Sequence, residues 1–214
     1  IRLFPYWLNY LYHKIKIVSI PLIGHNRQID YINKSRMRDT LPHAYLFYGP
    51  EHVGKSTIAL VLAQSFFCVT AHKDDICSVC GACSPCRAIA EYRHPHVIML
   101  DTEHTLTSKK ENRKEIPIED IRELKRIFSF APQGTAMRLA IINEADKMSA
   151  EAANAFLKLL EEPGPHTLII LITPSRDLLL PTIVSRTQQI GFLTIAKKNM
   201  DMLLGMLHLA MREE

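Results

Sequence analysis

The feature that most constrains this 214-residue chain is the stretch GPEHVGKS at positions 49–56. It fits the pattern G-x-x-x-x-G-K-[ST] and lies between a short apolar run, 43–49, and a stretch with helical spacing of apolar residues, 55–68. Glycines in such a loop let backbone N–H groups close on phosphate oxygens, and the helix that follows adds a favourable dipole. The sequence therefore predicts a strand, a phosphate-binding loop and a helix in succession.

Individual residues of this loop have distinct expected roles. Lys55 is expected to meet the β- and γ-phosphate oxygens, and Ser56 to reach Mg²⁺. The predicted nucleotide-binding set consists of Gly49, Pro50, Gly54, Lys55, Ser56, Thr57 and Asn143.

Strand-like and helix-like stretches alternate along the rest of the chain. Short buried-type runs predict strands at 43–49, 96–101, 138–143, 167–173 and 188–192. Helical patterns occupy 55–68, 86–93, 116–130 and 149–165, the last with Ser149 as its N-cap and Pro163-Gly164-Pro165 as its stop. This alternation predicts an α/β fold with a mainly parallel sheet and helices on both faces.

The strand at 138–143 ends in Asn143 and Glu144. In many ATP-hydrolysing proteins a strand ending here delivers an Asp that holds Mg²⁺ and a Glu that activates water. Asn143 keeps the size of Asp but lacks its negative charge. We therefore expect that ATP or ADP binds weakly at best and that turnover by the chain alone is negligible, although Glu144 remains available to poise a water.

Five cysteines lie within nineteen residues, at 68, 77, 80, 83 and 86. No secretory signal accompanies them, so a metal site is favoured over disulfides. Zinc is the expected metal. An iron–sulfur cluster is the alternative, because four of the cysteines follow the spacing C-x2-C-x2-C-x2-C, although iron–sulfur motifs normally have a longer spacing before the last cysteine.

The net charge of +4 is mild, and no apolar run reaches the roughly 18 residues that a membrane-spanning helix needs.

Several blocks, in order, resemble the bacterial DNA polymerase III clamp-loader subunits, which are AAA+ proteins. They are HAYLFYGPEHVGKST, IEDIRELKRIF, INEADKMSAEAANAFLKLLEEPGP and LLLPTIVSRTQQI, within 23–192. The stretches GPEHVGK, NEADKM and LLPTI resemble the delta-prime subunits more than their gamma/tau paralogues. His52 departs from the AAA+ pattern, which usually has glycine there, and a side chain at that point strains a positive φ.

The resemblance implies a stator: a cytoplasmic subunit with little or no ATPase of its own in the machine that loads a sliding clamp onto primed DNA. Its implied partners are gamma/tau, delta and, through the assembly, the clamp; DNA contact is indirect and no membrane is involved. Arg186, in Ser185-Arg186-Thr187, matches the arginine that the family offers in trans to a neighbour's ATP site. Thr187 replaces the family's Cys, and Thr173 matches the polar sensor at a strand end.

A gamma/tau-like ATP-hydrolysing motor is the alternative function, because Lys55, Ser56 and Glu144 are intact. A small-molecule kinase is a third, but the sequence has no arginine-rich lid for it. Turnover of ATP separates the first two. The basic segment 108–114 is a solvated loop or a DNA contact.

The resemblance also implies a four-cysteine structural zinc module written C-x8-C-x2-C-x2-C. The present chain has one cysteine more than this module. Cys68, at the end of the phosphate-loop helix, matches the family's first ligand, and Cys86 matches its last. The implied ligands are therefore Cys68, Cys80, Cys83 and Cys86, with Cys77 as the spare. The rival sets are 68/77/80/83 and 77/80/83/86. His94 and His96 are further candidates, although surface or helix-end roles fit them better.

The expected organisation has three parts. Residues 1–20 form an aromatic-rich N-terminal extension, 21–192 form the AAA+ domain with its zinc module at 68–86, and 193–214 begin a helical lid that is cut short. The sequence assigns no chemistry to the extension.

Overall fold

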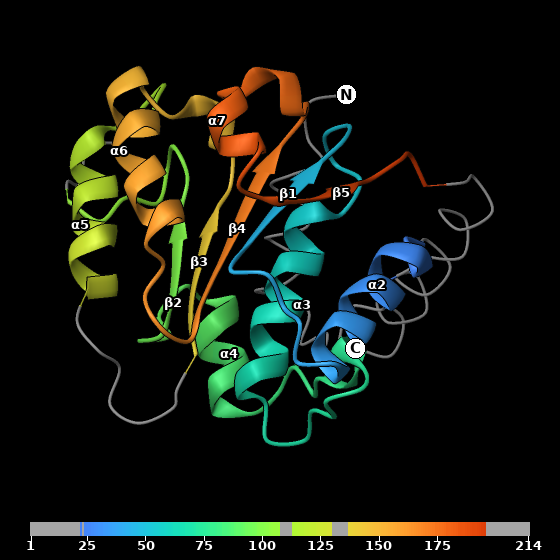
Figure 1. Ribbon diagram of the computed structural model, residues 1–214. Coiled ribbons are helices and arrows are strands. Elements are labelled where there is room, and N and C mark those ends of the chain that lie inside the picture. Colours follow the sequence, from blue (N-terminus) through green and yellow to red (C-terminus); the bar gives the residue numbers. More distant parts are fainter. Residues whose placement is uncertain (1–21, 23, 108–112, 130–136, 196–214) are drawn as a thin grey trace, which may run out of the picture.

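The computed structural model describes residues 22, 24–107, 113–129 and 137–195, so the extension and most of the lid segment lie outside the described residues. Five parallel strands form one sheet in the order β2-β3-β4-β1-β5 (Figure 1). The strands are β1 Ala44–Tyr48, β2 Val97–Leu100, β3 Arg138–Ile142, β4 Thr167–Thr173 and β5 Gln188–Gly191. The predicted parallel sheet is confirmed.

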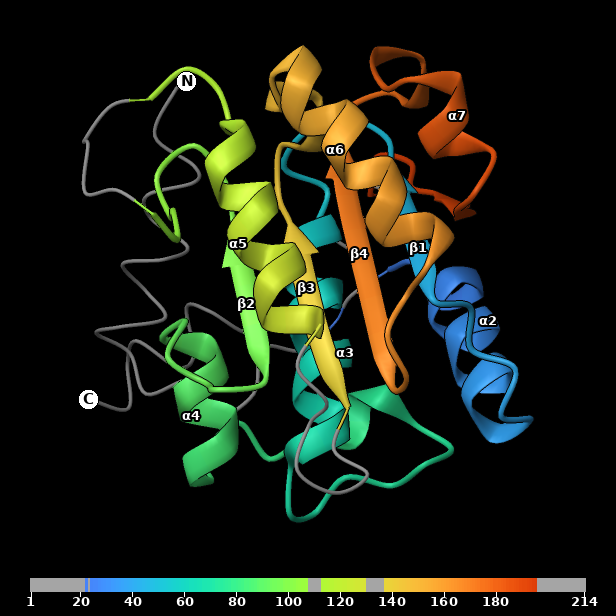
Figure 2. The same ribbon diagram turned by 60° about the vertical axis from the view of Figure 1, so that its left-hand side comes forward.

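Helices lie against both faces of this sheet (Figure 2). Side chains alternate across β1, so Tyr45 and Phe47 pack with α2 and α3, whereas Ala44 and Leu46 pack with α5 and α6. The helices are α2 Asn26–Met37, α3 Lys55–Phe67, α4 Ser84–Ala90, α5 Ile118–Ser129, α6 Ala150–Glu161 and α7 Pro181–Val184. Short 3₁₀ turns are η1 Ile76–Ser78, η2 Ala145–Lys147 and η3 Arg176–Leu178. Each face of the sheet thus has its own hydrophobic core.

Most predicted elements appear within two residues of their expected bounds. The expected cap of α6 is present, since Ser149 Oγ accepts a hydrogen bond from the backbone N–H of Ala152. The prediction for α4 was shifted: the helix begins at Ser84, before Pro85 at its first turn, and ends at Ala90. Proline is favoured in a first helical turn because it has no N–H to lose.

Two helices, α2 and α7, were not predicted from the sequence. The α2 stretch is mostly polar, and its packing depends on a few residues such as Ile29 and Ile32, which are buried. Arg36 of α2 is also buried, and its Nη2 donates to the backbone carbonyl of Ser65 at 2.7 Å. A buried arginine bound to α3 fixes α2 in a way that periodicity does not reveal.

The loops after β1, β2, β3 and β4 meet at the carboxyl edge of the sheet, where open α/β sheets bind ligands. The chain passes from β1 through α3 and α4 to β2 at the far edge and returns through β3 and β4. Among the described helices, none is long and apolar enough to cross a membrane.

Candidate functional site

The phosphate loop connects β1 to α3, as predicted, and its backbone explains two of its glycines. Gly49 has φ 138°, and a Cβ there would lie 2.1 Å from the carbonyl oxygen of Phe192, so no larger residue fits. Gly54 is the N-cap of α3 with φ 98°. His52 has φ 62°, the strained conformation expected for a side chain at this point.

Lys55 is buried, and its Nζ donates to the carbonyl oxygens of Gly49 and Pro50, both at 2.6 Å. Burial lowers the pKa of Lys55, and the negative charges of Glu51 and Asp146 oppose that shift. The ammonium is therefore held by its own loop in the described conformation.

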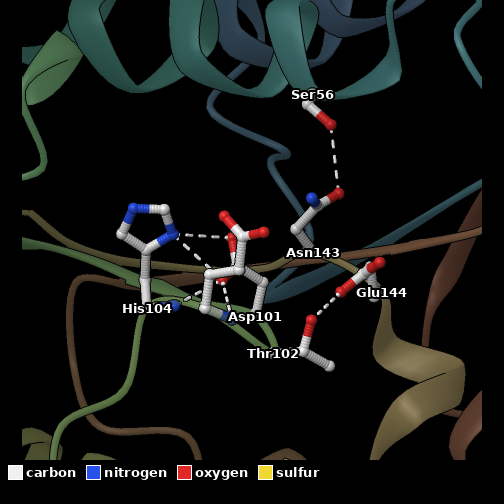
Figure 3. A network of polar contacts seen from close by, with 7 residues as sticks. Ser56, Asp101, Thr102, His104, Asn143 and Glu144 are labelled. Atoms are coloured by element: carbon white, nitrogen blue, oxygen red, sulfur yellow. Dashed lines mark hydrogen bonds and ion pairs between the residues drawn. The ribbon is translucent and has the colours of Figure 1, made fainter. Parts of the chain in front are cut away.

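Ser56, at the start of α3, meets the end of β3. Its Oγ donates to Oδ1 of Asn143 at 3.1 Å, a contact drawn in Figure 3. The hydroxyl expected to reach Mg²⁺ is thus bonded to a neutral amide. An aspartate at this position would instead place a negative charge beside it.

Glu144, the next residue, is held by the loop after β2. Thr102 Oγ1 donates to its Oε2 at 2.7 Å (Figure 3), and Glu144 itself has φ 53°, a left-handed conformation rare outside glycine. The carboxylate predicted to poise a water therefore already has a fixed partner.

An aspartate–histidine pair lies beside this network in the same view. His104 Nδ1 is 2.9 Å and 3.0 Å from the two carboxylate oxygens of Asp101, and the ring packs edge-on against Tyr92. The Asp101 contact raises the pKa of His104. Burial pushes the pKa of Asp101 up, but its hydrogen bonds from His104 outweigh burial and lower it.

These groups line one cavity of about 540 Å³ at the carboxyl edge of the sheet. It runs from the phosphate loop along α3 toward the cysteine segment. Its lining brings together predicted and unpredicted polar residues: Gly54, Lys55, Ser56, Thr57, Asp101, Thr102, His104, Asn143, Glu144, Asp146 and Thr173. Among the predicted set, Gly49 and Pro50 contribute the carbonyls that hold Lys55.

Thr173, the predicted sensor, is buried at the end of β4, and its Oγ1 donates to the carbonyl of Ser175 at 3.0 Å. Arg186 lies outside the cavity lining, just after α7. Its Nη2 is 2.9 Å from Oε1 of Glu161, the last residue of α6, and its Nη1 donates to the carbonyl of Thr182 at 3.0 Å. The side chain is 38% exposed, so Arg186 remains accessible to another chain.

Four of the five cysteines gather beyond the end of α3. The ligand atoms of Cys68, Cys80, Cys83 and Cys86 all lie within 4.8 Å of one another. Four thiolates around one tetrahedral Zn²⁺, each at about 2.3 Å from the metal, would lie at about 3.8 Å from one another, so the cluster fits such an ion. Cys77 is exposed and is not part of this group.

Hydrogen bonds within the cluster favour thiolates at two of its positions. The backbone N–H of Cys80 points at Cys68 Sγ and that of Cys83 at Cys80 Sγ, each at 3.3 Å. Burial raises the pKa of Cys68, yet hydrogen bonds, chiefly from Cys80 and Thr70, lower it to about 6. Burial and Asp75 raise the pKa of the excluded Cys77 to about 11.

The sequence interpretation missed Asp101, Thr102, His104 and Asp146. A usable signal existed for the first two: they follow a buried strand directly, and parallel strands bring their carboxyl ends to one edge. His104 depends on the turn after β2, and Asp146 on the 3₁₀ turn η2, which periodicity does not predict.

Comparison with known families identifies the group to which this architecture belongs. Residues 24–196 match the family model described as DNA polymerase III, delta subunit. The chain belongs to this family. It is 34% identical to the DNA polymerase III subunit delta' of Bacillus subtilis over 82% of the chain, and 34% identical to that of Pseudomonas aeruginosa over 69%. The matches cover 49% and 42% of those relatives, so the chain spans less than half of their length.

The fold is that of AAA+ P-loop domains. A DNA polymerase III gamma subunit-related protein from Thermotoga maritima superposes with a TM-score of 0.52 at 23% identity, over 82% of this chain and 47% of that one. A RuvB variant from the same organism gives 0.55 at 12% identity, over 89% and 52%. At these identities the likeness concerns the fold. The family match and the delta' relatives agree with the resemblance found in the sequence.

Proposed function

We propose that this chain is a delta-prime-like stator of a replicative clamp loader, a subunit that helps load the sliding clamp onto primed DNA without hydrolysing ATP appreciably itself. The observation that carries the proposal is the Ser56–Asn143 contact, because a neutral amide occupies the place of the metal-holding carboxylate. Family membership and the delta' relatives supply the assembly context.

In this function the phosphate loop retains at most weak binding of ATP or ADP. Backbone amides, Lys55 and Thr57 would hold the phosphates, and Ser56 would hold Mg²⁺, which neutralises phosphate charge when bound. Asn143 adds no charge to that metal, and Glu144 is engaged by Thr102. Thr173 lines the cavity at the end of β4, and we propose that it would orient the γ-phosphate or a water.

Arg186 would act on a neighbour rather than on this cavity. Its guanidinium lies outside the cavity lining and is partly exposed, with Glu161 and the Thr182 carbonyl as partners. An arginine supplied in trans stabilises negative charge that develops during phosphoryl transfer. The neighbours we propose are gamma/tau and delta subunits, with the clamp and primed DNA contacted through the assembly.

The direct test is reconstitution with the tau and delta subunits of the same organism. With this chain present, the mixture should form one complex that loads clamps onto primed DNA; without it, loading should fall to background. A mixture that loads clamps equally well without the chain would remove the stator role.

A gamma/tau-like motor is the second candidate, favoured by the retained Lys55 and Ser56 in a correctly folded loop. It predicts that the chain hydrolyses ATP by itself, whereas the stator does not. Turnover by the isolated chain therefore separates the two.

We further infer that Cys68, Cys80, Cys83 and Cys86 hold one structural Zn²⁺, which fixes the segment between α3 and α4. Elemental analysis of the purified chain should give about one zinc per chain and no iron. Cys80→Ser should release it, and the matched variant Cys77→Ser should retain it. Loss of zinc in Cys77→Ser with retention in Cys86→Ser would contradict this ligand set.

A further inference from the structure

The guanidinium of Arg186 is held by two groups that belong to different elements. Its Nη1 donates to the carbonyl of Thr182, four residues earlier in the same segment, at 3.0 Å, and its Nη2 donates to Oε1 of Glu161 at 2.9 Å. Glu161 is the last residue of α6, which lies beside α7 (Figure 2). Arg186 is therefore bonded both to its own segment and to a neighbouring helix.

The bond to Thr182 does not by itself fix Arg186 relative to the rest of the domain. Thr182 lies in α7, a helix of 4 residues that directly precedes Arg186, so this bond moves with the segment. The α6 helix has 12 residues, and Leu160, next to Glu161, is buried in the core. Among the described residues, Glu161 is thus the hydrogen-bonding partner that ties the guanidinium to the body of the domain.

The same two bonds leave Arg186 able to bind a phosphate. A guanidinium has five N–H donors in a rigid planar fork, and these bonds use one donor each. The side chain of Arg186 is 38% exposed and that of Glu161 is 48% exposed, so another chain can reach the guanidinium while it is held. An exposed ion pair contributes little to stability, so the effect expected of Glu161 is on geometry.

We propose that Glu161 is a positioning residue for Arg186: its carboxylate holds the guanidinium in the orientation in which Arg186 meets the phosphates at a neighbouring subunit's ATP site. The proposal rests on the trans role that the proposed function gives to Arg186. A charged group that is already oriented before its partner arrives stabilises the transition state without a further ordering cost. Glu161 contacts no nucleotide in this role, so its effect is exerted through Arg186.

The test is ATP turnover in an assembled loader in which only the ATP site that faces Arg186 keeps its phosphate-loop lysine. Glu161→Ala should lower kcat at that site by about tenfold and leave KM nearly unchanged, because a misplaced arginine weakens a contact made in the transition state. Glu161→Gln keeps an oxygen that accepts the Nη2 hydrogen bond and should retain most of the activity. Glu162→Ala removes the adjacent exposed carboxylate, is the matched control and should leave kcat unchanged.

A double variant shows whether Glu161 acts through Arg186. In the Arg186→Ala background, Glu161→Ala should have no further effect on turnover. An equal loss in both backgrounds would mean that Glu161 serves the fold or the assembly in general, and would overturn the proposal. Should the alanine variant fail to assemble, Glu161→Lys is the second variant: a lysine is favoured at a helix C-terminus but repels the guanidinium, so kcat should fall further.

Unchanged or faster turnover in Glu161→Ala, in a loader that Arg186→Ala slows, would also overturn the proposal and leave the trans role in place. Faster turnover would identify Glu161 as a restraint on Arg186. If Arg186→Ala itself leaves turnover unchanged, the trans role fails, and the positioning role fails with it.

Discussion

The phosphate-loop cavity and the segment after α7, which carries Arg186, differ in how their charged and polar side chains are held. In the cavity, Lys55 is held by its own loop and Ser56 is bonded to the neutral Asn143. After α7, Arg186 pairs with Glu161, is partly exposed and lies outside that cavity. Asn143 leaves the cavity without a carboxylate beside Ser56, whereas Arg186 leaves a partly exposed cation outside the cavity. The proposed function assigns these two regions separate roles, which separate substitutions can test.

The strongest way to break this comparison is Arg186→Ala. The test uses an assembled loader in which the phosphate-loop lysines of the partner subunits are replaced, except at the one ATP site that faces Arg186. ATP turnover at that site should fall by about 10³-fold, because the negative charge of the transition state loses its positively charged partner. The isolated chain should fold and bind nucleotide as before, which thermal melts and titration would check.

The matched control for this variant is Arg122→Ala, which removes an exposed arginine from α5. It should leave turnover unchanged. Equal activity of the Arg186→Ala and natural assemblies would remove the trans role from Arg186, whatever the cavity does.

Asn143→Asp tests the other side of the comparison. Restoring the carboxylate beside Ser56 should raise ATP turnover of the isolated chain by about 10²-fold, since one electrostatic contact to the transition state is commonly worth that much. Steady-state phosphate release measures it, with Asn143→Ala as the control that removes the amide without adding charge. If Asn143→Asp does not raise the rate of ATP turnover, the missing carboxylate at this position is not what limits hydrolysis in the cavity.

The sequence predicted the sheet, the phosphate loop and the Lys55, Ser56 and Asn143 positions because each depends on local patterns. Apolar runs identify strands, and a fixed glycine spacing identifies the loop. The four cysteines that the resemblance selects, Cys68, Cys80, Cys83 and Cys86, cluster in the structure and leave Cys77 outside the cluster.

Contacts between loops far apart in sequence were not predictable in the same way. The Thr102–Glu144 bond joins the loop after β2 to the loop after β3, and the Arg186–Glu161 pair joins the segment after α7 to the end of α6. Helix α2 was missed because a mostly polar stretch is fixed by Arg36 binding to α3, which is a tertiary contact.

A smaller effect, on the stability of the fold, is expected from the Asp101–His104 pair, which lines the phosphate-loop cavity. The pKa of His104 is raised in the folded chain, so its contribution to stability is complete below its unfolded value, about 6.5, and is lost as pH rises through the folded value. The pKa of Asp101 is lowered, so its contribution is lost only in acid. His104→Gln should therefore cost about 0.5 kcal/mol at mildly acidic pH and less at about pH 8, a small figure because solvent screens the partly exposed ring.

Urea unfolding of both proteins at several pH values checks this. The difference between the natural chain and His104→Gln should shrink as pH rises. A difference that grows toward alkaline pH would mean that the Asp101 contact does not stabilise the charged imidazole.

We expect the cavity of this chain not to carry out appreciable ATP hydrolysis, and turnover by the isolated natural chain is the decisive measurement. The measurement is phosphate release at saturating Mg²⁺-ATP, side by side with Lys55→Ala. Both proteins should release phosphate at the same background rate. Brisk release by the natural chain that Lys55→Ala abolishes would contradict the stator and identify a motor subunit.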